Sequence, residues 1–156
     1  MTILAKSILK LENGSEFHQL IEQSDAILTV YSSTGVGVFL PKNQSGWSAN
    51  SDMRIKRDIT PIESVMDKVL QLNPVYFNYI KDASDSDVRE GFIAQEIEVL
   101  FPSIVSNGTY SEELNDRVKG VCTANLIPYL VKAIQEQHTL ITQLTSRVDE
   151  LMARLI

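Results

Sequence analysis

The feature that most constrains the fold is a seven-residue repeat of apolar residues in the C-terminal part of the chain. One position of each heptad is Ile, Val or Leu, and the position three residues later is Leu everywhere except at Gln137. Such a and d positions, sustained over four heptads, are typical of a coiled coil. We therefore expect a long helix over about residues 124–156 with a continuous seam. The a positions are Ile127, Ile134, Ile141, Val148 and Leu155, and the d positions are Leu130, Gln137, Leu144 and Leu151.

Two partners for this seam are open: the domain that precedes the helix, or other copies of the chain. A helix of this length spans about 45 Å at about 1.5 Å per residue, which is more than a small preceding domain can cover. Self-association is therefore favoured. Branched a residues with Leu at d favour parallel dimers in isolated peptides, but the polar d residue Gln137 and the rest of the domain can override that preference. The repeat alone leaves the number of chains open.

The segment before this helix is expected to begin with a shorter helix. Thr60 is a good N-cap, Pro61 suits the first helical position, and Glu63 completes a capping box with Thr60. Apolar residues follow at helical spacing up to Leu70, and Asn73 precedes a proline that ends the helix.

Two β-hairpins are expected after this helix. Residues 75–80 are rich in aromatic and β-branched residues and should pair with the apolar residues 91–94 across a polar tip. A helical turn at 95–101, stopped by Pro102, leads to a second hairpin within residues 103–121. With the long helix, these elements predict an α+β fold.

Residues 1–50 predict short elements without a core of their own. We expect a strand ending in a turn at Asn13, a short helix within 15–23, two strands within 26–41 and then a polar linker. This segment holds too little apolar material for an independent core. It is expected to be the end of something longer, or to be stabilised by neighbouring copies.

Composition excludes several classes of function. Cys122 is the only cysteine, so neither an internal disulfide nor a cysteine metal site is expected, and His18 and His138 stand in no ligand motif. We expect no metal and no cofactor. The net charge of −6 and the absence of a basic block argue against nucleic-acid binding. No run of about 18 apolar residues occurs, so no membrane span is expected.

Four stretches of the chain, in order, resemble a known family. They read "SDMRIKRDI", "VLQLNPVYFNY", "GFIAQEIEVLFP" and "LIPYLVKAIQEQ". The chain from about Ser48 to its end is similar to the C-terminal intramolecular chaperone domains of bacteriophage tail spikes and tail fibres, of which the endosialidase tail spikes are the best-known example.

The resemblance implies a homotrimer whose long helices form a central bundle with β-hairpin arms. It implies that residues 51–156 form the chaperone domain and that residues 1–50 are the β-rich end of the fibre segment and its linker. The folding client would be the upstream fibre of the same polypeptide. Assembly would take place in the host cytoplasm, after which the fibre stays in the virion tail and the chaperone domain is released.

The resemblance also implies a single-turnover, self-cleaving serine peptidase. The family's catalytic serine falls on Ser51, its lysine on Lys56, and the cleaved bond lies between Asn50 and Ser51. Asp52 is expected to cap the following segment or to orient Lys56, and capping is the simpler role. Without the resemblance, a serine and a lysine in a polar linker would be read as solvated side chains.

The chemistry requires that the lysine act as a base. A free lysine has a pKa of about 10.4 and is protonated at neutral pH, whereas burial and nearby positive charge favour the neutral amine. Arg54 and Arg57 flank Lys56, and burial in an assembled trimer would add to their effect. Cleavage would then depend on assembly.

The spacing of the pair raises a separate question. Five residues place Ser51 and Lys56 on opposite faces of a strand and about 140° apart on a helix. Either the chain bends between Met53 and Ile55, or Lys56 reaches the serine of a neighbouring chain. The bend is the simpler alternative.

Two other functions compete with the cleaving chaperone. The chain could form a permanent trimeric tip that never cleaves, or a tip whose hairpin loops contact a host receptor. The intact motifs argue against the first. The loops are acidic and few exposed aromatic residues are expected there, which argues against a glycan-binding surface.

Overall fold

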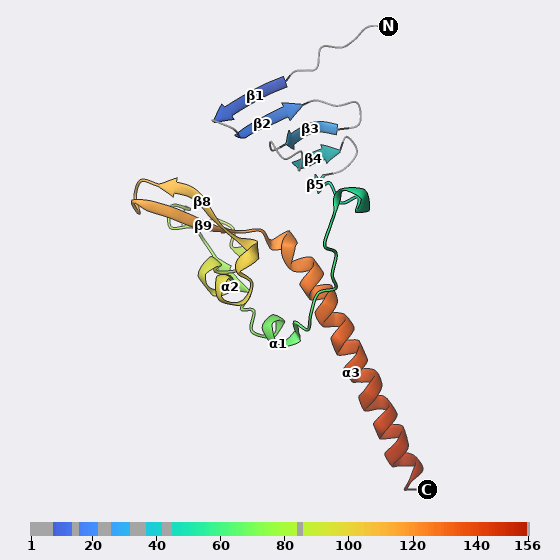
Figure 1. Cartoon of the computed structure of the whole chain (residues 1–156). Helices are drawn as coiled ribbons and strands as arrows, with labels where there is room; N and C mark the ends of the chain where they lie inside the picture. The colour runs from blue at the N-terminus through green and yellow to red at the C-terminus, as the bar shows by residue number, and fades with distance from the viewer. Residues whose placement is uncertain are drawn as a thin grey trace. The chain divides into compact units, whose positions relative to one another are not determined.

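The computed structural model describes the chain in two compact units, Met1–Thr60 and Pro61–Ile156 (Figure 1). The residues described are 8–13, 16–21, 26–31, 37–41, 45–83 and 86–155. The fold is α+β, as expected, with a long C-terminal helix and small antiparallel hairpins.

The described residues of the first unit form a meander of five antiparallel strands followed by one 3-10 turn. The sheet has the order β1-β2-β3-β4-β5. Its described elements form a single layer, whereas a stable domain packs two layers around a core. That the segment holds no core of its own stays a prediction. The strands are β1 (Ile8–Asn13), β2 (Glu16–Ile21), β3 (Ala26–Tyr31), β4 (Gly37–Pro41) and β5 (Ser48–Ala49), and the turn is η1 (Met53–Ile55).

Two expectations for this unit are wrong. Residues 16–21 form strand β2 instead of a helix, because the segment pairs along its length with β1 and at its end with β3. The register sets Leu20 opposite Leu9 and Val30, so pairing on two sides outweighs a weak helical pattern. The linker is also shorter than expected, since Ser48 belongs to β5 and pairs with Phe39 of β4.

The strands expected within 26–41 are confirmed as β3 and β4. The turns expected beside Asn13 and between β3 and β4 lie outside the described residues.

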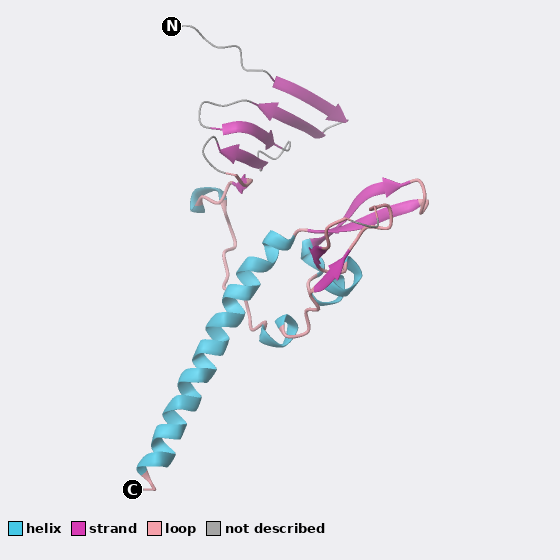
Figure 2. Cartoon of the chain, turned by 180° about the vertical axis from the view of Figure 1, so that it is seen from behind, coloured by secondary structure: helices cyan, strands magenta, loops and turns pink. Residues whose placement is uncertain are grey.

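Over its described residues, the second unit contains two hairpins, two short helices, two 3-10 turns and one long helix (Figure 2). Both hairpins are antiparallel, β6 with β7 and β8 with β9. The helices are α1 (Met66–Val69), α2 (Ala94–Leu100) and α3 (Ile127–Ala153), and the turns are η2 (Pro102–Ile104) and η3 (Thr123–Leu126). The strands are β6 (Val75–Phe77), β7 (Arg89–Gly91), β8 (Val105–Ser111) and β9 (Asp116–Val121).

A small apolar core joins α2, η2 and the start of α3. Its buried residues are Ile97, Phe101, Ile104 and Leu126. The ring of Phe101 packs on Tyr129 of α3, with centroids 4.7 Å apart. Val65 and Ala133 are also buried. The core therefore holds the first turns of α3, and it does not reach the helix's C-terminal half.

The expected helix start at Thr60 is wrong. The helix begins only at Met66, and residues 60–65 are neither helix nor strand. Among the described residues, the structure gives no capping hydrogen bond between Thr60 and Glu63. The N–H groups at the start of α1 bind a carboxylate of α3 instead, so a tertiary contact replaces the local capping box.

The expected hairpins are confirmed, with one shift. The strand that pairs with β6 is Arg89–Gly91 rather than residues 91–94, because Ala94 already begins α2. The long helix is confirmed over Ile127–Ala153, and η3 replaces its expected first turn.

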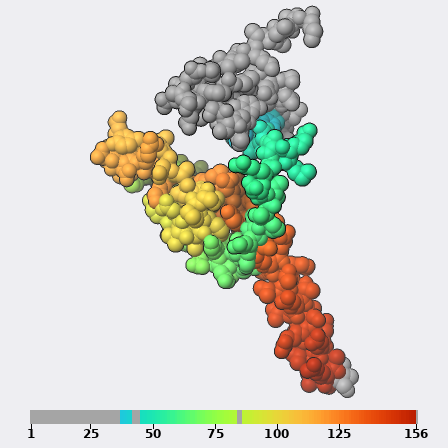
Figure 3. Space-filling model, viewed as in Figure 1, coloured from blue at the N-terminus to red at the C-terminus, as the bar shows by residue number. Residues whose placement is uncertain are grey.

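The C-terminal half of α3 projects from the rest of the second unit (Figure 3). Every residue from Gln137 to Leu155 is exposed within the chain. Ile141 keeps 53% of its surface exposed and Leu144 keeps 64%. The seam is therefore continuous and uncovered in the single chain.

Candidate functional site

Ser51 and Lys56 lie in direct contact across the 3-10 turn η1. The Lys56 Nζ donates a hydrogen bond to the Ser51 Oγ at 2.7 Å. The turn is closed by two backbone hydrogen bonds, from the N–H of Ile55 to the carbonyl of Asp52 and from the N–H of Lys56 to that of Met53. Of the two alternatives for this pair, the structure shows the bend within one chain. A single turn of 3-10 helix between two extended residues overcomes the unfavourable spacing.

Asp52 holds the start of this turn. Its Oδ1 accepts a hydrogen bond from the backbone N–H of Arg54 at 2.8 Å, so Asp52 is the N-cap of η1. The Arg54 guanidinium also binds this carboxylate, with its Nη2 2.6 Å from Oδ2. The hydrogen bond from the Arg54 side chain, and then that from its backbone, hold the pKa of Asp52 below its usual range. Of the two roles expected for Asp52, capping is the one that the contacts show.

The contact between Ser51 and Lys56 has the geometry of a nucleophile and its base. A separation of 2.7 Å lets the amine donate to the hydroxyl when protonated and accept the hydroxyl proton when neutral. Both side chains are exposed within the chain. A neutral lysine requires removal from water or nearby positive charge. The single chain thus brings the two groups together without supplying the burial that would activate them.

The proposed seam of α3 forms one stripe, with Gln137 as its single polar member. Of its members, Ile127, Ile134 and Val148 keep more than half of their surface exposed, and Leu155 keeps 82%. No contact within the described part of the chain covers the stripe beyond Gln137. This stripe shares no residue with the contact between Ser51 and Lys56, so each can be mutated without changing a residue of the other.

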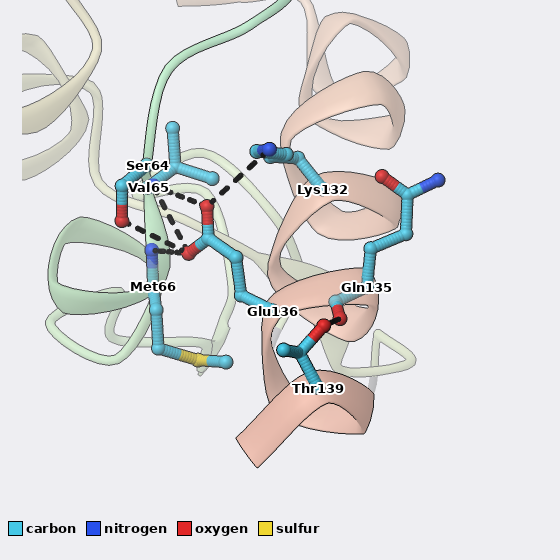
Figure 4. Close-up of polar contacts among 7 residues, drawn as sticks. All are labelled: Ser64, Val65, Met66, Lys132, Gln135, Glu136 and Thr139. Atoms are coloured by element: carbon cyan, nitrogen blue, oxygen red, sulfur yellow. Dashed lines mark hydrogen bonds and ion pairs between the residues drawn. The ribbon is translucent and has the colours of Figure 1, made fainter. Parts of the chain in front are cut away.

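One polar contact that sequence reasoning missed joins α3 to the start of α1 (Figure 4). The Glu136 carboxylate accepts hydrogen bonds from the Ser64 hydroxyl at 3.1 Å and from the backbone N–H groups of Met66 at 3.0 Å and Val65 at 3.3 Å. The Lys132 Nζ lies 3.8 Å from the same carboxylate. We call this contact the Glu136 cap. No local pattern indicates it, because its partners are about 70 residues apart.

The Glu136 cap favours the ionised carboxylate. Partial burial by itself raises the pKa of Glu136, but the hydrogen bonds from Met66, Ser64 and Val65, aided by Lys132, hold that pKa below its usual range. A carboxylate at a helix N-terminus also interacts favourably with the unpaired N–H groups there. Glu136 is therefore a charged acceptor that fastens the start of α1 to α3.

The hairpin arms carry exposed aromatic side chains, mostly on their strands rather than in the loops, where few were expected. Tyr76 keeps 75% of its surface exposed and Tyr79 keeps 62% in the first hairpin, and Tyr110 keeps 54% in the second. The Arg89 guanidinium lies over the Tyr79 ring, 5.0 Å from its centroid. These side chains give the arms a surface able to contact another chain.

Over the described residues, no group of three or more His, Cys, Asp or Glu side chains is arranged to hold a metal ion. Nor does any helix in this part of the chain combine the length and apolar character that a membrane crossing needs.

One family model matches the part of the chain that includes Ser51 and Lys56. Residues 51–106 match the family described as the chaperone of endosialidase, whose name classes it among the peptidases. This segment of the chain is therefore similar to the chaperone-of-endosialidase domain. The match to this domain starts at Ser51, the residue whose hydroxyl contacts Lys56, and ends within β8. Helix α3 follows the matched segment. No curated protein matches the chain.

Proposed function

We propose that this chain is a trimeric intramolecular chaperone that cuts itself between Asn50 and Ser51. One observation carries the proposal: the family match begins at a serine whose Oγ lies 2.7 Å from a lysine Nζ. In the proposal Ser51 is the nucleophile and Lys56 the general base. The chain requires no cofactor or metal for this reaction.

The reaction balances with water as the only co-reactant. The neutral Lys56 amine takes the proton of the Ser51 hydroxyl, and the Oγ attacks the carbonyl carbon of Asn50. The bond from this carbon to the Ser51 nitrogen breaks as the nitrogen receives a proton from Lys56, which leaves an ester on the Oγ. Water then hydrolyses the ester, giving a carboxylate on Asn50 and a free amino group and hydroxyl on Ser51.

The required rate is modest for an enzyme. One event per hour corresponds to a barrier of about 22 kcal/mol. The nucleophile is adjacent to the bond it attacks, so much of the entropic cost of bringing the reactants together is already removed. A site that acts once needs no substrate-binding pocket.

Assembly supplies the missing activation in this proposal. Ser51 and Lys56 are in contact yet exposed in the single chain. Packing of neighbouring chains or of the fibre over η1 would exclude water and favour the neutral amine. Cleavage would then report that assembly is complete.

The seam of α3 supports self-association. An apolar stripe with alternate spacings of three and four residues needs a partner helix. The helix is 27 residues long, and its C-terminal half meets nothing in the described chain. We propose that three copies pack along this stripe, as the resemblance implies.

The client in this proposal is the fibre segment upstream in the same polypeptide, of which residues 1–50 are the end. The single layer formed by the described strands of the first unit supports that assignment, since such a sheet needs a second layer from the upstream fibre or from neighbouring copies. In this proposal the chains assemble in the host cytoplasm. The fibre then stays in the virion tail, and the chaperone domain is released.

One observation favours an alternative. Exposed tyrosines on both hairpin arms would suit a tip that binds a receptor and is never released. The same tyrosines would serve equally to hold the fibre. Cleavage separates the two functions, because a permanent tip keeps the bond between Asn50 and Ser51.

Three variants test the dyad. Ser51→Ala and Lys56→Ala should each abolish cleavage and leave the native mass of the assembly unchanged. Lys56→Arg should also be inactive, because arginine keeps the charge and cannot lose its proton in a protein. Ser45→Ala, an exposed serine upstream, is the matched control and should be cut normally. Cleavage of Lys56→Arg at the wild-type rate would remove the base from the mechanism.

A further inference from the structure

The chain that directly follows Lys56 has few polar attachments. Residues 57–63 follow Lys56, and all seven are exposed. They form neither helix nor strand, and none of the hydrogen bonds described joins them to another part of the chain. We call residues 57–63 the connecting segment. Its conformational freedom depends on where its C-terminal end is held.

The Glu136 cap holds that end. Ser64 directly follows the connecting segment, and its hydroxyl donates to the Glu136 carboxylate at 3.1 Å. The next two backbone N–H groups, of Val65 and Met66, donate to the same carboxylate. The side chain of Val65 is buried, with 7% of its surface exposed. Figure 4 shows the carboxylate reaching from α3 to all three groups.

Glu136 is placed so that it can act within an assembly. It directly precedes Gln137 of the seam, and it occupies the c position of the heptad, which lies outside the contact between coiled-coil helices. Packing of other copies along the seam therefore leaves the carboxylate free to hold Ser64. The residue thus links a part of α3 that assembly would order to the segment that carries Ser51 and Lys56.

We propose that Glu136 is a positioning residue for self-cleavage. By fastening Ser64 to α3, it limits the free chain after Lys56 to the connecting segment and reduces the range over which the Ser51–Lys56 turn moves. A shorter free segment raises the effective concentration of this turn at the neighbouring chains that would cover it. This inference rests on the proposed cleavage.

Glu136→Gln tests the inference, because the amide replaces one acceptor oxygen with a donor NH₂. The cleavage rate constant of the assembled protein should fall by about ten- to a hundredfold, while the native mass stays that of the wild-type assembly. Glu150→Gln, on the same helix, removes an exposed carboxylate and is the matched control, with an unchanged rate.

Two further measurements separate positioning from a general loss of stability. In Glu136→Gln, the backbone amides of Val65 and Met66 should lose protection against hydrogen exchange. The protection of the Ile97 amide in the core should stay unchanged. Leu126→Ala removes buried core volume and should lower the melting temperature without slowing cleavage well below that temperature. A proportional loss of rate in Leu126→Ala and Glu136→Gln would overturn the positioning role.

Ser64→Ala removes one of the three donors and leaves the helix sequence intact. It should slow cleavage several-fold. If Glu136→Gln does not assemble, the cleavage rate of Ser64→Ala tests the positioning role instead. If the wild type cleaves and both cap variants cleave at its rate, the inference is wrong while the proposed function stands. If the wild type itself remains uncut on assembly, the proposed function fails first.

Discussion

At the residue scale, the contact between Ser51 and Lys56 depends on the turn that separates them. The sequence indicated both residues through the resemblance, and the odd spacing indicated that a bend was needed. The kind of bend could not be predicted, because a 3-10 turn of three residues has no periodicity to detect. Asp52 supplies the visible signal in retrospect, since aspartate is a preferred N-cap.

The Asp52 cap leads to a prediction with a matched pair of variants. Asp52→Ala removes the acceptor for the Arg54 N–H, so the turn opens more often and cleavage should slow about tenfold. Asp52→Asn keeps an oxygen in the same place and should cleave at nearly the wild-type rate. The ion pair with Arg54 is exposed and contributes little. The rates can be read from the masses of the products, and equal rates for Asp52→Ala and the wild type would contradict the role of the cap.

At the element scale, sequence patterns predicted the elements whose contacts are local. The hairpins β6–β7 and β8–β9 and the helix α3 follow from strand-forming residues, polar tips and a heptad repeat. The start of α1 could not be predicted, because its N–H groups bind Glu136 rather than Thr60 or Glu63. Strand β2 was mistaken for a helix for the same reason, since its neighbours β1 and β3 decide its conformation. In both cases the segment's conformation depends on a partner that is not part of the segment's own sequence pattern.

The Glu136 cap also predicts how the second unit responds to acid. Because the pKa of Glu136 is lowered on folding, its contribution to stability is fully present above the pKa of the unfolded glutamate, about 4.3. That contribution is lost as the pH falls through the lower folded value. The melting temperatures of the wild type and Glu136→Gln should therefore differ by a constant amount above about pH 5 and converge in more acidic solution.

Thermal unfolding between about pH 3 and pH 7 measures this difference. Glu150→Gln should show no such convergence, because Glu150 is exposed and outside the cap. A difference between the wild type and Glu136→Gln that persists unchanged to the lowest pH would show that the charge of Glu136 does not stabilise the contact.

At the scale of the whole molecule, the described chain holds less core than its elements need. The first unit is a single sheet, the core of the second centres on four buried side chains, and the seam of α3 is exposed. Each feature is explained if several copies pack together. The heptad repeat predicted this from the sequence, whereas the number of copies follows only from the resemblance.

Ile141→Asp should prevent both assembly and cleavage. Ile141 is a central a position, and assembly would bury one carboxylate from each chain close to the others, which costs several kcal/mol per charge. Gln143→Asp adds the same charge at an exposed position off the seam and should assemble and cleave normally. Native mass spectrometry reports the assembly, and cleavage by a strictly monomeric Ile141→Asp chain would show that assembly does not control the site.

Mixed assemblies test whether each chain uses its own lysine. A Ser51→Ala chain and a Lys56→Ala chain, distinguishable by mass, are assembled together. The contact within one chain predicts that neither is cut, because neither holds both groups. Cleavage of the Lys56→Ala chain in mixed trimers would show instead that its serine uses the lysine of a neighbour.

The central claim is that three chains assemble and that each chain is then cut once, between Asn50 and Ser51. The most direct test is to weigh the purified protein twice, once under native conditions and once after denaturation. The account predicts a trimer in the native measurement and, in the denatured one, a fragment that begins at Ser51. Ser51→Ala should form the same trimer from uncut chains. A native trimer of the wild-type protein whose denatured chains keep their full mass after prolonged incubation would contradict the account.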